Sequence, residues 1–206
     1  MARSATLRLE RRPGGLREAQ RRLTRDRLVD AAILLIGKTG FRAVTVEQIA
    51  AAAGANRATF YLHFRNKEDV ANEIGARLSP NIQAQFRALD ALVSPSRDQV
   101  RDWLAAMADQ SAQRRHLLAI ATETNVTDPD LADDYFRFID LFIDAMPNYL
   151  GRFSDAERPA ARLRLMMQIV QLERLFYVVV VQRASTPLAP LLDAMAESWT
   201  QVLNPN

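Results

Sequence analysis

The sequence predicts an all-α protein of about nine helices, with a small N-terminal domain of three helices and a larger helical C-terminal domain. Two observations predict this fold. Apolar residues recur at helical spacing along nearly all of the 206 residues, and no strand-like alternation of useful length is present. Hydrophobic residues make up 49% of the chain, which indicates a globular protein with one substantial core or a small domain joined to a larger one.

The composition excludes several classes of function. The chain has no cysteine and only two histidines, His63 and His116, so it can form neither a disulfide nor a cysteine/histidine zinc site. No group of residues resembles a catalytic site or a phosphate-binding loop, and we expect no enzyme activity, no metal and no cofactor. The arginine-rich start does not resemble a signal peptide, and the longest apolar run, 175–181, is much shorter than a membrane span. We therefore expect a soluble, cytoplasmic protein.

Charge is distributed unevenly along the chain. Residues 1–67 hold 14 Lys and Arg against 5 Asp and Glu, whereas residues 68–206 hold 13 against 19. A basic segment joined to an acidic remainder is typical of a nucleic-acid-binding module attached to a body that does not bind nucleic acid. A solvated basic tail explains residues 1–23 equally well, but it does not explain the basic residues that follow inside a folded segment, Arg57, Arg65 and Lys67.

The N-terminal domain is expected to begin after a flexible, arginine-rich arm over residues 1–23. Thr24 is expected to cap the first helix, with Asp26 in its first turn. The helix should end before Gly40. Its core face is formed by apolar residues at helical spacing: Leu28, Ala31, Ala32, Leu35 and Ile36.

Two short helices should follow, joined by a tight turn. Thr45 is expected to cap one and Asn56 the other, and Gly54 supplies the positive φ of the turn between them. Phe60 and Phe64 are four residues apart, so both should face the core. We expect a fourth helix to begin after Asn66, and Pro80 to kink or end it after Ser79.

Further helices are expected across residues 96–114, 116–125, 128–153, 154–183 and 187–203. The four valines in 175–181 favour a strand by propensity, yet no partner strand lies nearby. Read as a helix, residues 163–181 are apolar on two faces, and both must then be buried. The second face would pack either against a second copy of the chain or inside a single core.

The exposed side of the third helix has the side chains of a DNA-reading surface. A short helix of this kind can enter the major groove, where Arg57 suits a bidentate contact with guanine. Thr59, Tyr61 and His63 can each donate to a phosphate, and Lys67 adds a charge beside a helix N-terminus. Each residue also has a simpler interpretation: His63 at the core edge, Tyr61 in packing only, and Lys67 as a solvated charge.

The segment TVEQIA, the turn at Gly54 and the run ATFYLHFRNK resemble the N-terminal domain of the tetracycline-repressor (TetR) family. The resemblance covers about residues 24–70. It implies a homodimer that binds a near-palindromic operator in double-stranded DNA and represses transcription until a small molecule binds the C-terminal domain. By position, Thr45 would contact phosphate and Asn56, Arg57 and Ala58 would lie near bases. The backbone anchors would be Thr59, Tyr61, His63 and Lys67.

The resemblance divides the chain into an arm at 1–23, a helix-turn-helix domain at 24–68 and an effector-binding and dimerisation domain at 69–206. The last two helices, about 160–183 and 187–203, would form the dimer interface. An apolar or aromatic effector would suit a pocket in the middle helices, although the same residues could be ordinary core, and Glu173 could equally be an interface or surface charge. The candidates for this pocket are Trp103, Met107, Ile120, Thr124, Phe142, Met146, Met167, Glu173 and Tyr177.

Two other functions remain open from the sequence. A chain of the same fold could act as an activator or an architectural DNA-binding regulator without any small-molecule ligand. More remotely, the C-terminal domain could be an enzyme or a protein-binding module that the N-terminal domain tethers to DNA.

Overall fold

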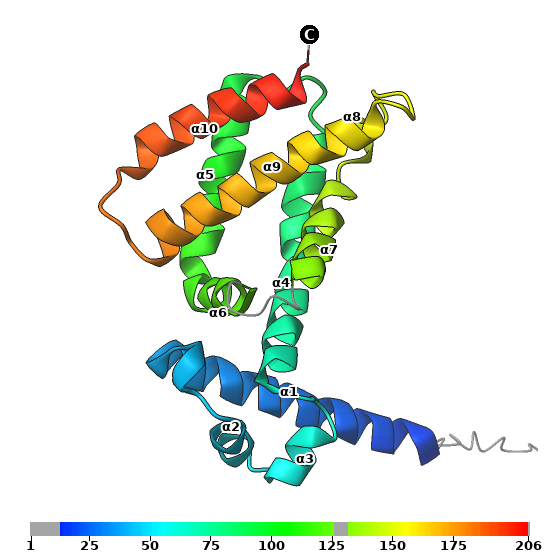
Figure 1. Cartoon of the computed structure of the whole chain (residues 1–206), viewed down its shortest axis with the longest axis vertical. Helices are drawn as coiled ribbons and strands as arrows, with labels where there is room; N and C mark the ends of the chain where they lie inside the picture. The colour runs from blue at the N-terminus through cyan, green and yellow to red at the C-terminus, as the bar shows by residue number, and fades with distance from the viewer. Residues whose placement is uncertain (1–12, 126–131, 206) are drawn as a thin grey trace, which may run out of the picture.

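A computed structural model of the chain describes residues 13–125 and 132–205, and every regular element in these ranges is helical (Figure 1). The ten α-helices are α1 Pro13–Thr39, α2 Val46–Ala52, α3 Arg57–Tyr61, α4 Lys67–Asp90, α5 Arg97–Gln113, α6 Arg115–Asn125, α7 Ala132–Ile143, α8 Pro147–Leu150, α9 Arg158–Phe176 and α10 Leu188–Leu203. Two short elements complete the list, η1 Phe41–Ala43 and η3 Tyr177–Val181. The all-α prediction is confirmed.

The helix count differs from the prediction because the segment expected at 128–153 contains two helices. α7 ends at Ile143, and α8 starts at Pro147, a residue that favours the first turn of a new helix. Asp90 of α4 fixes this start, because its two carboxylate oxygens accept from the backbone N–H groups of Asn148 and Tyr149, each at 2.8 Å. The expected opening of the segment at residues 128 and 129 lies outside the described residues.

The first helix starts earlier than we predicted. α1 begins at Pro13, so residues 13–23 are helical and the expected flexible arm and cap at Thr24 are wrong over this stretch. Thr24 lies inside the helix, where its hydroxyl donates to the carbonyl of Gln20 at 3.0 Å. Residues 13–23 are rich in Arg, Leu, Glu, Ala and Gln, which are good helix formers, and a proline is tolerated in a first helical turn. Residues 1–12 lie outside the described ranges.

α4 is one continuous helix from Lys67 to Asp90, with Pro80 inside it, so of the two alternatives expected at Pro80 the end after Ser79 is wrong. A proline inside a helix costs about 3 kcal/mol. The residues beyond it, Phe86 and Leu89, are both buried in the C-terminal core, and their burial offsets this cost. α4 therefore runs out of the N-terminal helices and into the C-terminal bundle (Figure 1).

The buried side chains form two separate clusters. The N-terminal cluster takes its residues from α1, η1, α2, α3 and the first half of α4, including Val70 and Ile74. The first turns of α4, beyond the predicted boundary at 68/69, therefore pack with the N-terminal helices. The same cluster also contains Ile120 of α6, a helix that lies between α1 and the rest of the C-terminal bundle (Figure 1).

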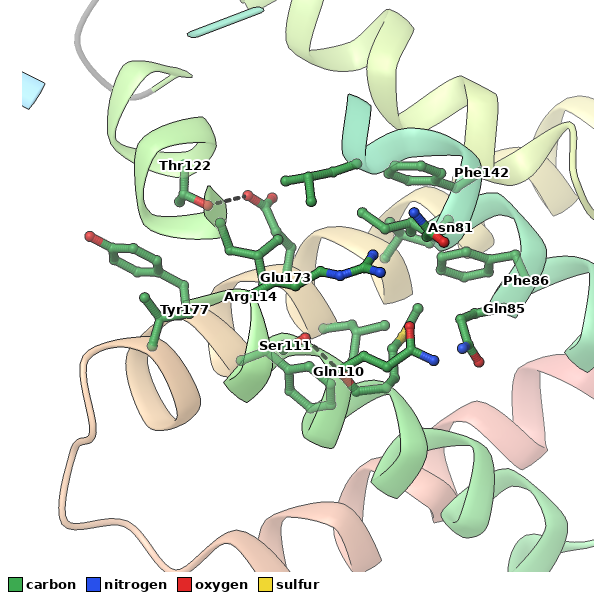
Figure 2. A pocket seen from close by; sticks show the side chains of 18 of the residues that line it. Asn81, Gln85, Phe86, Gln110, Ser111, Arg114, Thr122, Phe142, Glu173 and Tyr177 are labelled. Carbon is green, nitrogen blue, oxygen red and sulfur yellow. Dashed lines mark hydrogen bonds between the residues drawn. The ribbon is translucent and has the colours of Figure 1, made fainter. Parts of the chain in front are cut away.

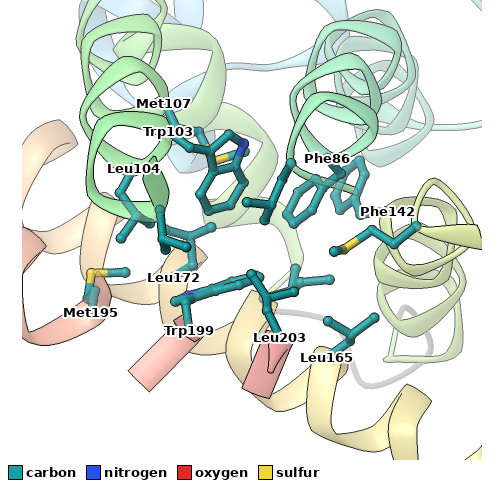
Figure 3. Close-up of a cluster of buried hydrophobic side chains, with 14 of the residues drawn as sticks. Phe86, Trp103, Leu104, Met107, Phe142, Leu165, Leu172, Met195, Trp199 and Leu203 are labelled. Atoms are coloured by element: carbon teal, nitrogen blue, oxygen red, sulfur yellow. The ribbon is translucent and has the colours of Figure 1, made fainter. Parts of the chain in front are cut away.

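The C-terminal cluster is built around four aromatic rings (Figure 3). Phe86 stacks on Phe142 with ring centroids 5.6 Å apart, and Trp103 lies 5.2 Å from Trp199 of α10. The Trp103 indole N–H donates to the carbonyl of Gln85 at 2.9 Å, so its polar atom is satisfied in the core. α10 buries its apolar face in this cluster, against α5 of the same chain.

The ambiguous segment 175–181 is helical. It completes α9 and then forms the π-helical turn η3, so the strand that four valines favour does not form. Wide turns of this type often occur at functional sites. Tyr177 and Val181 of η3 both line the cavity described below. Across the described ranges, no helix is both long and apolar enough to cross a membrane.

Candidate nucleic-acid interface

α2 and α3 form a helix-turn-helix around Gly54. Gly54 has a φ of +67°, as predicted, which a residue with a side chain rarely adopts. A Cβ placed here would also lie 2.9 Å from Nη2 of Arg27 on α1. The positive φ of the turn therefore favours glycine, because the flexible end of the Arg27 side chain could move away from a Cβ.

Side chains cap both helices of the motif, as predicted. Thr45 forms a reciprocal pair with Gln48: the Thr45 hydroxyl accepts from the Gln48 backbone N–H at 3.3 Å, and the Gln48 side chain accepts from the Thr45 backbone N–H at 2.9 Å. The Asn56 side-chain oxygen accepts from the Thr59 backbone N–H at 2.8 Å. Because this oxygen already accepts one hydrogen bond in the cap, the amide nitrogen is the part of the Asn56 side chain that the cap leaves free to contact a base.

α3 has one buried side and one exposed side. Phe60 and Phe64 are buried as predicted, with ring centroids 5.7 Å apart. Arg57 and Ala58 are exposed, and Tyr61 has 47% of its surface exposed although it is aromatic. Thr59 and His63 are partly buried at the edge of this face. The predicted reading positions therefore share one accessible surface, outside the aromatic pair that fixes the helix.

Arg57 contacts two neighbouring side chains on this exposed face. Its Nη1 lies 3.0 Å from Oε1 of Glu47 on α2, and its Nη2 donates to the Tyr61 hydroxyl at 3.4 Å. The hydrogen bond to Tyr61, followed by the charges of Tyr61 and Glu47, raises the pKa of Arg57 above its ordinary value. Arg57 is thus a permanent cation on the exposed face, with an acidic neighbour that DNA would have to displace.

α1 supports the end of α3 through Arg25. This guanidinium donates to the carbonyl of His63 at 2.7 Å, pairs with Glu73 of α4 at 2.7 Å and lies over the ring of Phe64. Burial, followed by the charges of Arg21 and Arg25, lowers the pKa of His63 below its ordinary value of 6.5. His63 is therefore neutral at pH 7 and retains one N–H donor.

Lys67 occupies a position that the sequence did not predict. Its ammonium donates to the carbonyls of Phe41, Arg42 and Val44 at 3.1, 3.4 and 3.3 Å, and it lies 4.6 Å from the Phe41 ring centroid. These contacts fasten the η1 loop to the start of α4. Lys67 was expected to contact phosphate, but in this structure its ammonium stabilises the loop that leads into α2.

This geometry is that of a known family of proteins. Residues 28–74 match the model of the family described as bacterial regulatory proteins, tetR family. The N-terminal domain of the chain belongs to the TetR family. The matched residues run from the buried face of α1 through the helix-turn-helix to Ile74 in α4, so they coincide with the N-terminal core.

Curated relatives with a TetR-type DNA-binding domain match part of the chain. The HTH-type transcriptional regulator TcmR of Streptomyces glaucescens is 46% identical over 57 residues, which is 28% of this chain and 25% of TcmR. The HTH-type transcriptional repressor KstR2 of Rhodococcus jostii is 31% identical over 106 residues, 46% of this chain and 52% of KstR2. The chain thus matches about half the length of KstR2 and a quarter of TcmR.

Solved structures agree over nearly the whole chain, but at low identity. Thermus thermophilus FadR, a TetR-family transcriptional repressor in complex with lauroyl-CoA, superposes with a TM-score of 0.56 at 23% identity, covering 87% of this chain and 93% of FadR. SmeT, the repressor of a Stenotrophomonas maltophilia multidrug efflux pump, gives a TM-score of 0.58 at 20% identity, covering 86% and 88%. At these identities the likeness shows a shared fold.

The C-terminal part of the chain contains a cavity between α4, α5, α6, α7, α9 and η3 (Figure 2). Four of the nine predicted pocket residues line it: Met107, Phe142, Glu173 and Tyr177. Four others lie elsewhere. Trp103 and Met146 are buried in the C-terminal core beside the cavity, Ile120 is in the N-terminal core, and Met167 is 71% exposed on α9. Thr124 lies on α6, and its side chain is outside the described part of the structure.

Several residues that position these sites were missed from the sequence. Gln48 was detectable, because Thr-x-x-Gln ahead of an apolar run is a capping-box pattern. Glu47, Arg25 and Arg114 gave no such signal. Arg25 contacts residues far away in sequence. Arg114 lines the cavity, whose walls come from separate helices, so its place there follows only from the fold.

Proposed function

We propose that this chain is a sequence-specific DNA-binding repressor of the TetR type, which leaves its operator when a small effector binds the cavity in its C-terminal domain. The observation that carries the proposal is the exposed face of α3. It presents Arg57, Ala58 and Tyr61 outward, while Phe60 and Phe64 anchor its other side in the core. A helix that is anchored by its buried face and carries a permanent cation on its exposed face suits entry into a major groove.

The residues of this face divide into two roles. Arg57 and Ala58 would meet base edges, with Asn56 reaching them through its amide nitrogen. Thr45, Thr59, Tyr61 and His63 would donate to phosphates on either side. Lys67 would act mainly by holding the η1 loop, and a direct phosphate contact would require it to leave its three carbonyls.

The repressor would act as a homodimer, because a near-palindromic operator requires two recognition helices related by a twofold axis. α9 supports this arrangement, since Leu163 and Met167 are large apolar residues with 59% and 71% of their surface exposed. α10 packs its apolar face inside its own subunit, so its contribution would come from the opposite side, where Ala194 is exposed. Exposed apolar residues grouped on one helix suit burial against a second copy.

α6 offers a physical link between the cavity and the DNA-binding helices. Leu118 and Thr122 of α6 line the cavity, whereas Ile120 of the same helix is buried in the N-terminal core. An effector that favours a shifted position of α6 would move the N-terminal core with it and change the separation of the two recognition helices. Such a ligand must bind one arrangement more tightly than the other, because equal binding shifts no population.

The proposal is tested by binding the full chain to duplex DNA from the region that flanks its own coding sequence. We expect a protected site with near-twofold symmetry, occupied by two copies of the chain, and binding that survives an excess of random-sequence DNA. Binding that random DNA competes away at equal concentration, or a chain that is monomeric on and off DNA, would refute the proposal.

A further inference from the structure

The cavity in the C-terminal domain has a volume of about 120 Å³. Its walls are mostly apolar and include Phe86, Phe142, Leu172 and Phe176. An engineered apolar cavity of about 150 Å³ in another protein holds a benzene molecule, so the space here suits a body of about one ring or a short alkyl chain.

Two charged side chains, Glu173 and Arg114, face this apolar space (Figure 2). They differ in the hydrogen-bond and ion-pair partners that the protein itself supplies. Glu173 of α9 has two donors: the Tyr135 hydroxyl at 2.5 Å and the Thr122 hydroxyl at 3.3 Å. Burial, followed by the hydrogen bond to Glu173, raises the pKa of Tyr135, so Tyr135 remains a protonated donor. The carboxylate is therefore held by α6 and α7 and is not free for a ligand cation.

Arg114 is the opposite case. It lies at the end of α5, and its guanidinium extends into the middle of the cavity (Figure 2). Across residues 13–125 and 132–205, no carboxylate lies within ion-pair distance of it. The other polar side chains that line the cavity include the amides of Asn81, Gln85 and Gln110, which are neutral. A half-buried guanidinium without a counter-charge is costly, and an anion that pairs with it removes this cost.

We infer that the effector is a small monoanion, a carboxylate joined to an apolar body of about one ring, and that Arg114 is the residue that binds its carboxylate. This inference rests on the proposed function, because it names the chemical class of the effector. The guanidinium would bind the carboxylate in a bidentate contact, and the side-chain amides that line the cavity would supply further hydrogen bonds. The ring or alkyl body would lie against Phe86, Phe142 and Leu172.

The experiment compares three probes with the same apolar body and different charge. These are phenylacetate, 2-phenylethanol and 2-phenylethylamine, each titrated by calorimetry into the full wild-type chain at pH 7.5. Charge-assisted hydrogen bonds contribute about 1.5–3 kcal/mol, so phenylacetate should bind roughly tenfold or more tightly than the neutral alcohol. The amine should bind most weakly, because it meets the same guanidinium.

The deciding variant is Arg114→Gln, with Arg115→Gln as its matched control. Arg115 is the next residue in the chain and is exposed at the start of α6, outside the cavity lining. In Arg114→Gln the affinity for phenylacetate should fall to within about threefold of that for 2-phenylethanol, whereas Arg115→Gln should keep the wild-type preference. The unfolding midpoint of each ligand-free variant shows whether its fold is intact, and Arg114→Lys, which keeps the charge, should retain a preference for the anion.

Several results would overturn the inference: no binding of phenylacetate, equal binding of the three probes, or an anion preference that survives in Arg114→Gln. The same preparations are assayed for DNA binding, which separates this inference from the proposed function. Sequence-specific DNA binding without any preference for the anion refutes the inference alone. An Arg114-dependent anion preference in a chain that binds no DNA specifically refutes the repressor and leaves the ligand site standing.

Discussion

Glu47 and Arg57 face each other across the turn of the helix-turn-helix, with Oε1 of Glu47 3.0 Å from Nη1 of Arg57. The pair joins α2 to the first residue of α3 at the surface that would meet DNA. Glu47 therefore orients the cation expected to read a base, and at the same time it competes with DNA for that cation. The net effect of Glu47 on affinity depends on which of these two roles is larger.

We predict that Glu47→Gln strengthens DNA binding. An exposed ion pair is weak, so little orientation is lost, whereas the removal of a negative charge near the phosphates is favourable. Affinity for operator and random DNA should both rise, by roughly two- to fivefold at low salt, and the gain should shrink as salt is added. Fluorescence anisotropy at two salt concentrations measures this, and a lower operator affinity would show that orientation is the larger effect.

Arg57→Ala should reduce operator affinity much more than affinity for random DNA. A good bidentate contact to guanine contributes about 1–3 kcal/mol of discrimination, so the ratio of the two affinities should fall by roughly tenfold or more. Arg87→Ala is a matched control, because Arg87 is an exposed arginine in the second half of α4, remote from the helix-turn-helix. Equal losses on both DNAs would mean that Arg57 contacts only the backbone.

Lys67→Ala should lower the stability of the protein as well as its affinity for DNA. Removal of the ammonium leaves the carbonyls of Phe41 and Val44 without this donor, and an unsatisfied buried acceptor costs about 1–3 kcal/mol. Affinity for operator and random DNA should fall alike. Lys38→Ala provides the control, since Lys38 is exposed and should change the free energy of unfolding by less than about 0.5 kcal/mol. An unchanged free energy of unfolding in Lys67→Ala would contradict the stabilising role of Lys67.

Operator affinity should increase as the pH falls, and His63 should be the cause. The pKa of His63 in the free protein is lowered below 6.5 by burial and by Arg21 and Arg25. A nearby phosphate would raise it again, so the complex takes up a proton that the free protein does not hold. Affinity should therefore rise from about pH 7.5 to about pH 5.5. The rise should vanish in His63→Gln and persist in His116→Gln, which changes the other histidine; the reverse pattern would exclude His63.

Local patterns predicted much of the interface. Gly54, Asn56, Phe60 and Phe64 act over a few residues, through a turn, a cap and one turn of helix, and the structure has each as the sequence predicted. The same local logic explains the error at Thr24, where a residue that often caps a helix instead bonds back to Gln20 inside one.

The sequence could not predict contacts that only the folded chain creates. Lys67 reaches carbonyls 23 to 26 residues away, and Arg25 reaches the carbonyl of His63. In the C-terminal domain, apolar residues cover two faces of α9, so helical spacing alone did not separate Met167 on the exposed side from the cavity side. Arg114 was missed because an arginine at a helix end usually interacts with that end and with solvent.

The central claim is that α3 reads a DNA sequence, and selection from a pool of randomised duplex DNA tests it most directly. The full chain should enrich a near-palindromic sequence whose two half-sites lie about one helical turn apart, some 34–36 Å, or a multiple of it. Arg57→Ala should enrich the same sequence less strongly or lose one base position in each half-site. A pool that stays random after repeated selection, or one enriched identically by the wild type and Arg57→Ala, would contradict the claim.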